Sequence, residues 1–232
     1  MSPDEKAWQD IRSRVVAAAD AAHRDPASIR VLAVSKSVSV EAIRAAYAMG
    51  QRTFGENYVQ EAATKIAALA ELAGIEWHLI GPLQGNKAGA AARNFSWVET
   101  VDRPEIARRL SSARGGHLPA LNVCVQVNIS AETTKHGASP SKSLALAREI
   151  ASLPGLALRG FMGIAQAHRD GGAVRSQFRA LREMFDAGRR EGLALDTLSM
   201  GMSSDFEIAI AEGATQLRIG SALFGPRAAG AP

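Results

Sequence analysis

The sequence predicts an α/β fold, a single (β/α)8 barrel of the TIM type with an extra N-terminal helix. Short apolar segments alternate with segments of helical periodicity eight times, which is typical of parallel strands with helices packed outside them. A chain of 232 residues is long enough for eight such units, toward the small end of this fold's range. The alternative is an open doubly wound sheet, but no G-x-G-x-x-G motif follows the first expected strand.

The expected strands are apolar runs that end at glycine, proline or polar residues. We expect them over residues 30–36, 52–55, 75–80, 97–101, 121–129, 156–162, 195–200 and 215–219. In the fifth, the alternation places Val123, Val125 and Val127 on one face, and Cys124 and Gln126 on the other. We therefore expect one domain over residues 1–232, with residues 1–25 forming a helix packed on the barrel.

The expected helices have apolar residues at helical spacing. In the first, Trp8, Ile11, Val15, Val16 and Ala19 share a face. The helices are expected over residues 3–23, 40–49, 58–73, 87–92, from 104 onward, 140–153, 172–191 and 205–211, with one turn after residue 220. Ser39 is the expected N-cap of the second helix and Gly50 its C′ residue. Asp102, followed by Pro104 and Glu105, is the expected cap of the fifth.

Composition limits the classes of function. The net charge is +4, from 27 Lys and Arg and 23 Asp and Glu that are interspersed along the chain, so we expect no nucleic-acid partner. The single cysteine, Cys124, excludes an internal disulfide and a cysteine-cluster metal site, and its apolar surroundings indicate a buried structural thiol. No apolar stretch approaches about 18 residues, so we expect a cytoplasmic protein without a membrane contact.

Lys36 ends an apolar strand in which Leu32, Val34 and Lys36 share one face. A buried ammonium is costly, so this lysine either opens a solvated loop or serves as a nucleophile at the mouth of a pocket. A carbonyl cofactor such as pyridoxal phosphate is the natural partner of such a nucleophile. The residues alone leave both interpretations open.

Polar and sulfur-bearing side chains recur where the expected strands end. A barrel of this kind has its active site at the C-terminal ends of its strands. Residues at those ends are Lys36, Asn57, His78, Asn128, Met162, Ser203 and Arg218. For His78, a packed core histidine and a residue of the site are both open interpretations.

The loops after the last two strands are candidates for a phosphate site. They contain Ser203 and Ser204 in MGMSSD, and Gly220 and Ser221 in IGSALFG, at the position where such barrels bind phosphate. Ordinary capping by the serines and a turn at Gly220 is the alternative. Arg218 donates hydrogen bonds but accepts none, so against a pyridine nitrogen it would leave that nitrogen unprotonated and the cofactor a weak electron sink.

Several motifs together resemble one family, the pyridoxal phosphate homeostasis proteins, which are related to the N-terminal barrel of alanine racemase. The motifs are AVSK (33–36), FGENYVQE (54–61), WHLIGPLQGNK (77–87), VQVNIS with Glu132, Lys135 and Gly137 (125–137), LSMGMSSDFEIAI (198–210) and LRIGSALFG (217–225). They span nearly the whole chain in a specific order.

The resemblance implies that pyridoxal 5'-phosphate (PLP) is bound covalently to Lys36 as a Schiff base. Asn57 would line the cofactor and Arg218 would face its pyridine nitrogen. Ser203 and Gly220, with neighbouring backbone at Met202, would hold its phosphate, and His78 is included among the cofactor-binding residues. The implied function is intracellular vitamin B6 homeostasis, in which PLP is bound reversibly and supplied or buffered, with PLP-dependent apoenzymes as recipients and without substantial catalysis.

Two departures from the racemase bear on catalysis. SVSVE after Lys36 lacks the tyrosine-bearing segment, and the chain ends before a second domain that would supply the opposite-face base and a dimer interface; we therefore expect a monomer without catalytic residues. The histidines are scattered without metal spacing, so we expect no metal-binding residues. A low-activity amino-acid racemase is the alternative, although it needs two acid–base groups and Tyr47 and Tyr58 are the only tyrosines. A Schiff-base aldolase acting on a phosphorylated sugar is a third candidate. It would need an acid–base group beside Lys36, and the loop residue Glu56 is the only acid expected there.

Overall fold

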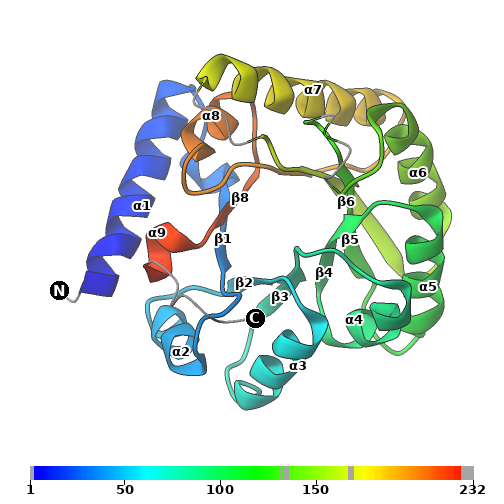
Figure 1. Cartoon of the computed structure of the whole chain (residues 1–232), viewed down its shortest axis with the longest axis horizontal. Coiled ribbons are helices and arrows are strands. Elements are labelled where there is room, and N and C mark those ends of the chain that lie inside the picture. The colour runs from blue at the N-terminus through cyan, green and yellow to red at the C-terminus, as the bar shows by residue number, and fades with distance from the viewer. Residues whose placement is uncertain (1–2, 131, 133–135, 167–169, 226–232) are drawn as a thin grey trace.

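Eight parallel strands close into a barrel in the order of the sequence, β1 to β8 (Figure 1). The computed structural model describes residues 3–130, 132, 136–166 and 170–225. The first and last strands pair directly, with Leu32 opposite Arg218, so the predicted barrel is confirmed. The strands are β1 (Arg30–Val34), β2 (Thr53–Glu56), β3 (Glu76–Leu79), β4 (Trp97–Val101), β5 (Leu121–Val127), β6 (Leu156–Gly163), β7 (Thr197–Ser199) and β8 (Gln216–Ile219).

Helices surround this barrel (Figure 1). They are α1 (Pro3–Ala21), α2 (Val40–Ala48), α3 (Val59–Ala68), α4 (Ala88–Asn94), α5 (Pro104–Arg114), α6 (Pro140–Ser152), α7 (Gly171–Arg190), α8 (Phe206–Ala211) and α9 (Ser221–Phe224), with 3-10 turns η1 (Pro26–Ser28) and η2 (Gly85–Lys87). The single domain over 1–232 stays a prediction, because residues 1–2, 131, 133–135, 167–169 and 226–232 lie outside the described part. Lys135 of the fourth motif is one of these residues.

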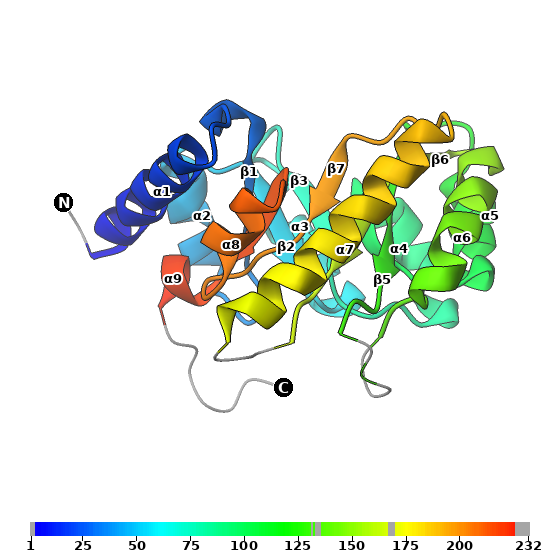
Figure 2. The same ribbon diagram turned by 90° about the horizontal axis from the view of Figure 1, so that it is seen from above.

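The N-terminal helix takes the outer position beside the short last helix. In both views α1 lies beside α8 and α9 (Figure 1 and Figure 2). The Trp8 ring meets the Phe224 ring edge-on, with 6.0 Å between the ring centroids, and Arg14 pairs with Glu207. Because α9 is only four residues long, α1 covers the side of the barrel that a longer final helix would cover. Val16 is 44% exposed, so its predicted place on the buried face was wrong.

Helix ends follow local backbone chemistry. Ser39 accepts a hydrogen bond from the Ala42 N–H, and Gly50 has φ 94°, so the predicted cap and C′ residue of α2 are confirmed. The N-cap of α5 is Arg103, without a side-chain cap bond, so the prediction of Asp102 was wrong; its carboxylate pairs with Arg103 instead. The helix predicted over 58–73 ends at Ala68, because Leu69 leaves helical geometry at φ −119°.

Apolar side chains fill the layer between strands and helices, whereas the barrel interior is partly polar. Trp97, Cys124 and Met162 form a small apolar cluster separate from the main core. Cys124 is fully buried, as predicted, and burial raises the pKa of its thiol well above the ordinary value. The interior therefore combines an apolar cluster with buried polar groups that bear on the site.

Neither a membrane span nor a metal cluster is found in the described part of the chain. Its helices lack the combination of length and apolar character that a bilayer crossing requires. Groups of three or more His, Cys, Asp or Glu placed to hold a metal ion are also absent from the described residues.

Candidate functional site

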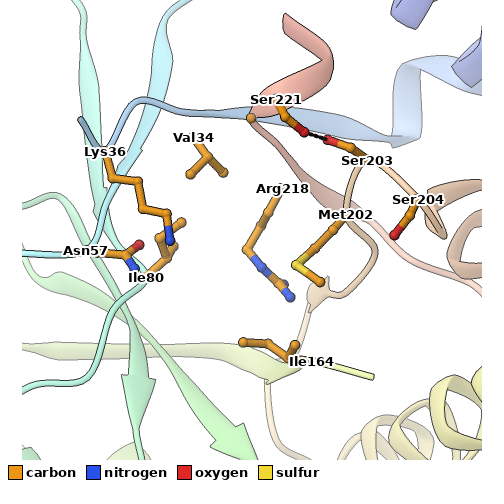
Figure 3. Close-up of a pocket in the computed structure, with 11 residues that line it drawn as sticks. Val34, Lys36, Asn57, Ile80, Ile164, Met202, Ser203, Ser204, Arg218 and Ser221 are labelled. Carbon is orange, nitrogen blue, oxygen red and sulfur yellow. Dashed lines mark hydrogen bonds between the residues drawn. The ribbon is translucent and has the colours of Figure 1, made fainter. Parts of the chain in front are cut away.

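A cavity of about 360 Å³ lies at the C-terminal ends of the strands (Figure 3). This volume falls within the range of small-molecule sites. Its lining residues are Val34, Lys36, Asn57, Ile80, Ile164, Met202, Ser203, Ser204, Arg218, Gly220 and Ser221. All the cofactor-binding residues implied by the resemblance except His78 are in this set, so residues far apart in the sequence meet at one place.

Lys36 lines the cavity from the turn after β1, because the strand ends at Val34 and not at residue 36 as predicted. Val34 and Lys36 both line it, while Ser35 between them is fully buried and hydrogen-bonds to Glu56 on the outer side of the strand. In Figure 3 the Lys36 side chain extends into the cavity toward Asn57 and Ile80. Lys36 therefore shares the side of Val34, as predicted, although the strand itself ends two residues earlier.

The backbone at Asn57 is held by a close approach of the loop after β3. A Cβ at Gly81 would lie 2.2 Å from the Asn57 carbonyl oxygen, a distance that no side chain tolerates. Glycine at position 81 therefore lets the two loops touch and places Asn57 on the rim, opposite the loops after β7 and β8.

Arg218 enters the cavity from β8 and is 4% exposed. Its Nη1 donates to the Ser199 hydroxyl at 2.8 Å, and its Nη2 donates to the Gly163 carbonyl at 2.8 Å. Burial lowers the pKa of Arg218, against the opposing effect of Glu99 and Asp205, but a guanidinium stays charged in proteins. The site therefore has a fixed, oriented cation.

Beneath Arg218 lies a buried carboxylate, Glu99, that the sequence patterns did not reveal. It accepts hydrogen bonds from the Ser199 hydroxyl at 2.6 Å and the Gln216 amide at 2.7 Å, and its Oε1 is 2.7 Å from His78 Nδ1. Burial raises the pKa of Glu99, but His78, Arg218 and Ser199 outweigh burial and leave it below the ordinary value. An acid in the centre of the apolar run WVETV was the signal that could have found it.

His78 lies below the cavity rather than in its lining. It is fully buried, and its ring stacks on Trp97 with 5.0 Å between centroids and 6° between planes. Its contact with Glu99 links it to Arg218 through Ser199. Of the two interpretations of His78, the structure places it in the packed interior.

The loops after β7 and β8 bring hydroxyl groups together. The Ser221 and Ser203 Oγ atoms are 3.5 Å apart, and both side chains lie on the same side of the cavity as Ser204 (Figure 3). Gly201 has φ 93°, and a Cβ there would lie 2.6 Å from the Ala209 Cβ, so glycine allows the tight turn before Met202. The Met202 N–H donates to Asp205 at 2.6 Å, which fixes this loop against α8.

The remaining candidates lie outside this cavity. Asn128 lines a neighbouring cavity of about 260 Å³ that shares Asn57, Ile80 and Ile164. Met162 packs in the barrel interior. Tyr47 donates its hydroxyl to the Ala73 carbonyl, and Tyr58 is 52% exposed; neither is in the lining of the Lys36 cavity.

Glu56 does not face the barrel interior. It is the last residue of β2, fully buried on the outer side of the sheet, and its Oε1 lies 2.9 Å from Lys65 Nζ. The expectation of Glu56 as an acid in a loop beside the inward face was therefore wrong. Burial raises its pKa, because the bonds from Ser35 and Lys65 compensate only in part.

Comparisons with known proteins agree with this geometry. Residues 9–228 match the family model of the alanine racemase N-terminal domain. The pyridoxal phosphate homeostasis protein of Pseudomonas aeruginosa is 51% identical over 222 residues, which cover 96% of this chain and 95% of that protein. The protein of the same name from Escherichia coli K12 is 46% identical over 222 residues, covering 94% of each chain.

Solved structures give the same result. PipY of Synechococcus elongatus without PLP is 39% identical with a TM-score of 0.83, and it aligns over 93% of this chain and 100% of its own. A Clostridium difficile alanine racemase, 15% identical with a TM-score of 0.70, aligns over 86% of this chain and 53% of its own; this likeness concerns the fold alone. The resemblance predicted from the motifs is confirmed, and the chain belongs to the pyridoxal phosphate homeostasis protein family.

Proposed function

We propose that this protein binds pyridoxal 5'-phosphate as a Schiff base on Lys36 and acts in vitamin B6 homeostasis without substantial catalysis. The observation that carries the proposal is the convergence of Lys36, Arg218 and the serine-bearing loops on one cavity. A PipY structure with PLP bound, 38% identical to this chain with a TM-score of 0.81 over 93% of this chain and 100% of its own, supports the choice of cofactor.

The donor set of the cavity fits this cofactor. Lys36 would supply the amine that condenses with the aldehyde. Ser203 and Ser221, with the backbone at Met202 and Gly220, would hold the phosphate, and Arg218 would donate to the pyridine nitrogen. Apolar surface for the ring comes from Val34, Ile80 and Ile164. When bound, the cofactor supplies an electron sink for amino-acid chemistry, and an arginine at its ring nitrogen keeps that sink weak.

Racemisation is the alternative activity, and the site favours it less. It requires acid–base groups on both faces of the reacting carbon. Lys36 can serve one face, but no tyrosine lines the cavity in the described part of the chain. We therefore propose a cytoplasmic, monomeric carrier that exchanges PLP with PLP-dependent apoenzymes.

Reductive trapping tests the proposal. The purified protein is incubated with PLP, reduced with borohydride and digested, and the modified residue is identified by mass spectrometry. We expect the modification at Lys36 and its loss in Lys36→Ala. Absence of a visible absorption band and of any trapped cofactor in the wild type would overturn the proposed function. Stereospecific turnover of a free amino acid that is lost in Lys36→Ala would favour the racemase instead.

A further inference from the structure

A buried ionic network lies on the outer side of the barrel behind Lys36. Lys65 on α3 is 6% exposed. Its Nζ donates to the Ser35 carbonyl at 2.7 Å, to Glu56 at 2.9 Å and to Glu61 at 2.6 Å. These groups are absent from the cavity lining, so the network acts from behind the strand.

The network holds the main chain on both sides of Lys36. On one side, the Ser35 carbonyl accepts from Lys65 and the Ser35 hydroxyl donates to Glu56 at 2.6 Å. On the other, the Ser37 N–H donates to Glu61 at 2.6 Å. The residue between these two anchors is the one whose amine enters the cavity.

Ser37 makes such anchoring necessary. Its φ is 58°, in the left-handed region, where a non-glycine residue is strained and persists only when its surroundings hold it. The hydrogen bond to Glu61 supplies that support, and Lys65 fixes the Glu61 carboxylate in turn. Removal of the Lys65 ammonium would leave the two carboxylates at the end of β1 without the cation that lies between them.

We propose that Lys65, with Glu56 and Glu61, is a positioning network that aims the Lys36 amine at the cofactor aldehyde. The inference rests on the proposed function, because it concerns the reaction of Lys36 with PLP. Lys65 touches no reacting atom and acts through the backbone of residues 35–37. The condensation joins the Lys36 amine nitrogen to the aldehyde carbon and releases water, so its rate depends on the direction from which the amine approaches.

The test measures Schiff-base formation after PLP is mixed with wild-type protein or Lys65→Met, followed by visible absorbance. We expect the rate at saturating PLP to fall about 10- to 100-fold, since misplacement by about 1 Å from a remote change can cost that much. The PLP concentration at half-saturation should stay within about twofold of wild type, because the phosphate loops are unchanged. Lys65→Arg, which restores the cation, should recover part of the rate.

Arg114→Met is the matched control. Arg114 is also 6% exposed, and it donates to the Pro119 carbonyl at 2.7 Å and the Phe95 carbonyl at 2.9 Å. Arg114 also donates to the Ala92 carbonyl, and none of these partners belongs to residues 35–37. This variant removes an equally buried cation, so we expect a lower unfolding midpoint with an unchanged rate of Schiff-base formation.

The outcomes separate the two proposals. Lys65→Met that loses stability but reacts at the wild-type rate would overturn the positioning role and leave the proposed function intact. Wild-type protein that forms no Schiff base would instead refute the proposed function. If Lys65→Met does not fold, Glu61→Ala replaces it; Glu61 is partly exposed, and an unchanged rate in that variant would equally overturn the inference.

Discussion

Replacement of Glu99 by glutamine tests the buried network under Arg218. Glu99→Gln preserves the shape of the side chain but removes its charge and turns one acceptor into a donor. The lost acceptor faces either Ser199 or the pair His78 and Gln216, which contact the carboxylate at 2.6–2.7 Å. One hydrogen bond to a charged group is worth about 1.5–3 kcal/mol, and removing one partner of a buried ionic network costs about 3–5 kcal/mol.

We therefore expect Glu99→Gln to lower the free energy of unfolding by about 3–5 kcal/mol. Urea unfolding followed by tryptophan fluorescence measures it, and Trp97, stacked on His78, reports from inside the network. Glu191→Gln is the control, because this carboxylate pairs with Arg148 at the surface and the midpoint should not move. A loss below about 1 kcal/mol for Glu99→Gln, with an unchanged slope of unfolding free energy against urea concentration, would refute the reasoning that the charge of Glu99 stabilises this network.

Three other perturbations address acid stability, the cofactor contact and the outer helix. The folded pKa of Glu99 lies below its ordinary value of 4.5, so the stability that Glu99 contributes is fully present above pH 4.5 and is lost as pH falls through the folded pKa. When the unfolding midpoint is measured against decreasing pH, Glu99→Gln should therefore lose less stability than wild type. Arg218→Ala should weaken PLP retention about 10-fold or more, the equivalent of one charged hydrogen bond, measured by equilibrium dialysis; unchanged affinity and spectrum would contradict its role. Trp8→Ala should lower the free energy of unfolding by about 3–5 kcal/mol. It should also weaken PLP retention, because Trp8 packs on α9, the helix that begins at Ser221. PLP retention equal to that of wild type would show that α1 does not support the phosphate-binding loop.

The barrel could be predicted from the sequence because its signal repeats. Each apolar strand precedes a helical segment, and an error of a few residues at one end leaves the order of elements intact. The lining of the cavity followed from the fold, since a barrel brings strand ends together whatever their separation in sequence. Lys36, Asn57 and Arg218 were found in this way.

The buried polar networks could not be derived in the same way. Glu61 and Lys65 have the i, i+4 spacing of an exposed ion pair, and nothing in the sequence reveals that α3 presses them against the end of β1. For Glu99, alternation with Trp97 could give its face, but its partners Ser199 and Gln216 lie 100 and 117 residues further along the chain. Such contacts depend on how elements pack, which periodicity does not report.

The seam where β1 meets β8 has a consequence for synthesis of the chain. Lys36 follows the first strand, whereas Arg218 and Ser221 belong to the last segments, and α1 packs on α8 and α9 across the same seam. A growing chain therefore has no complete cavity until its final strand has left the ribosome. A ligand that bridges these residues would fasten the first and last segments together, and it would stabilise the closed barrel to a degree set by its concentration relative to its dissociation constant.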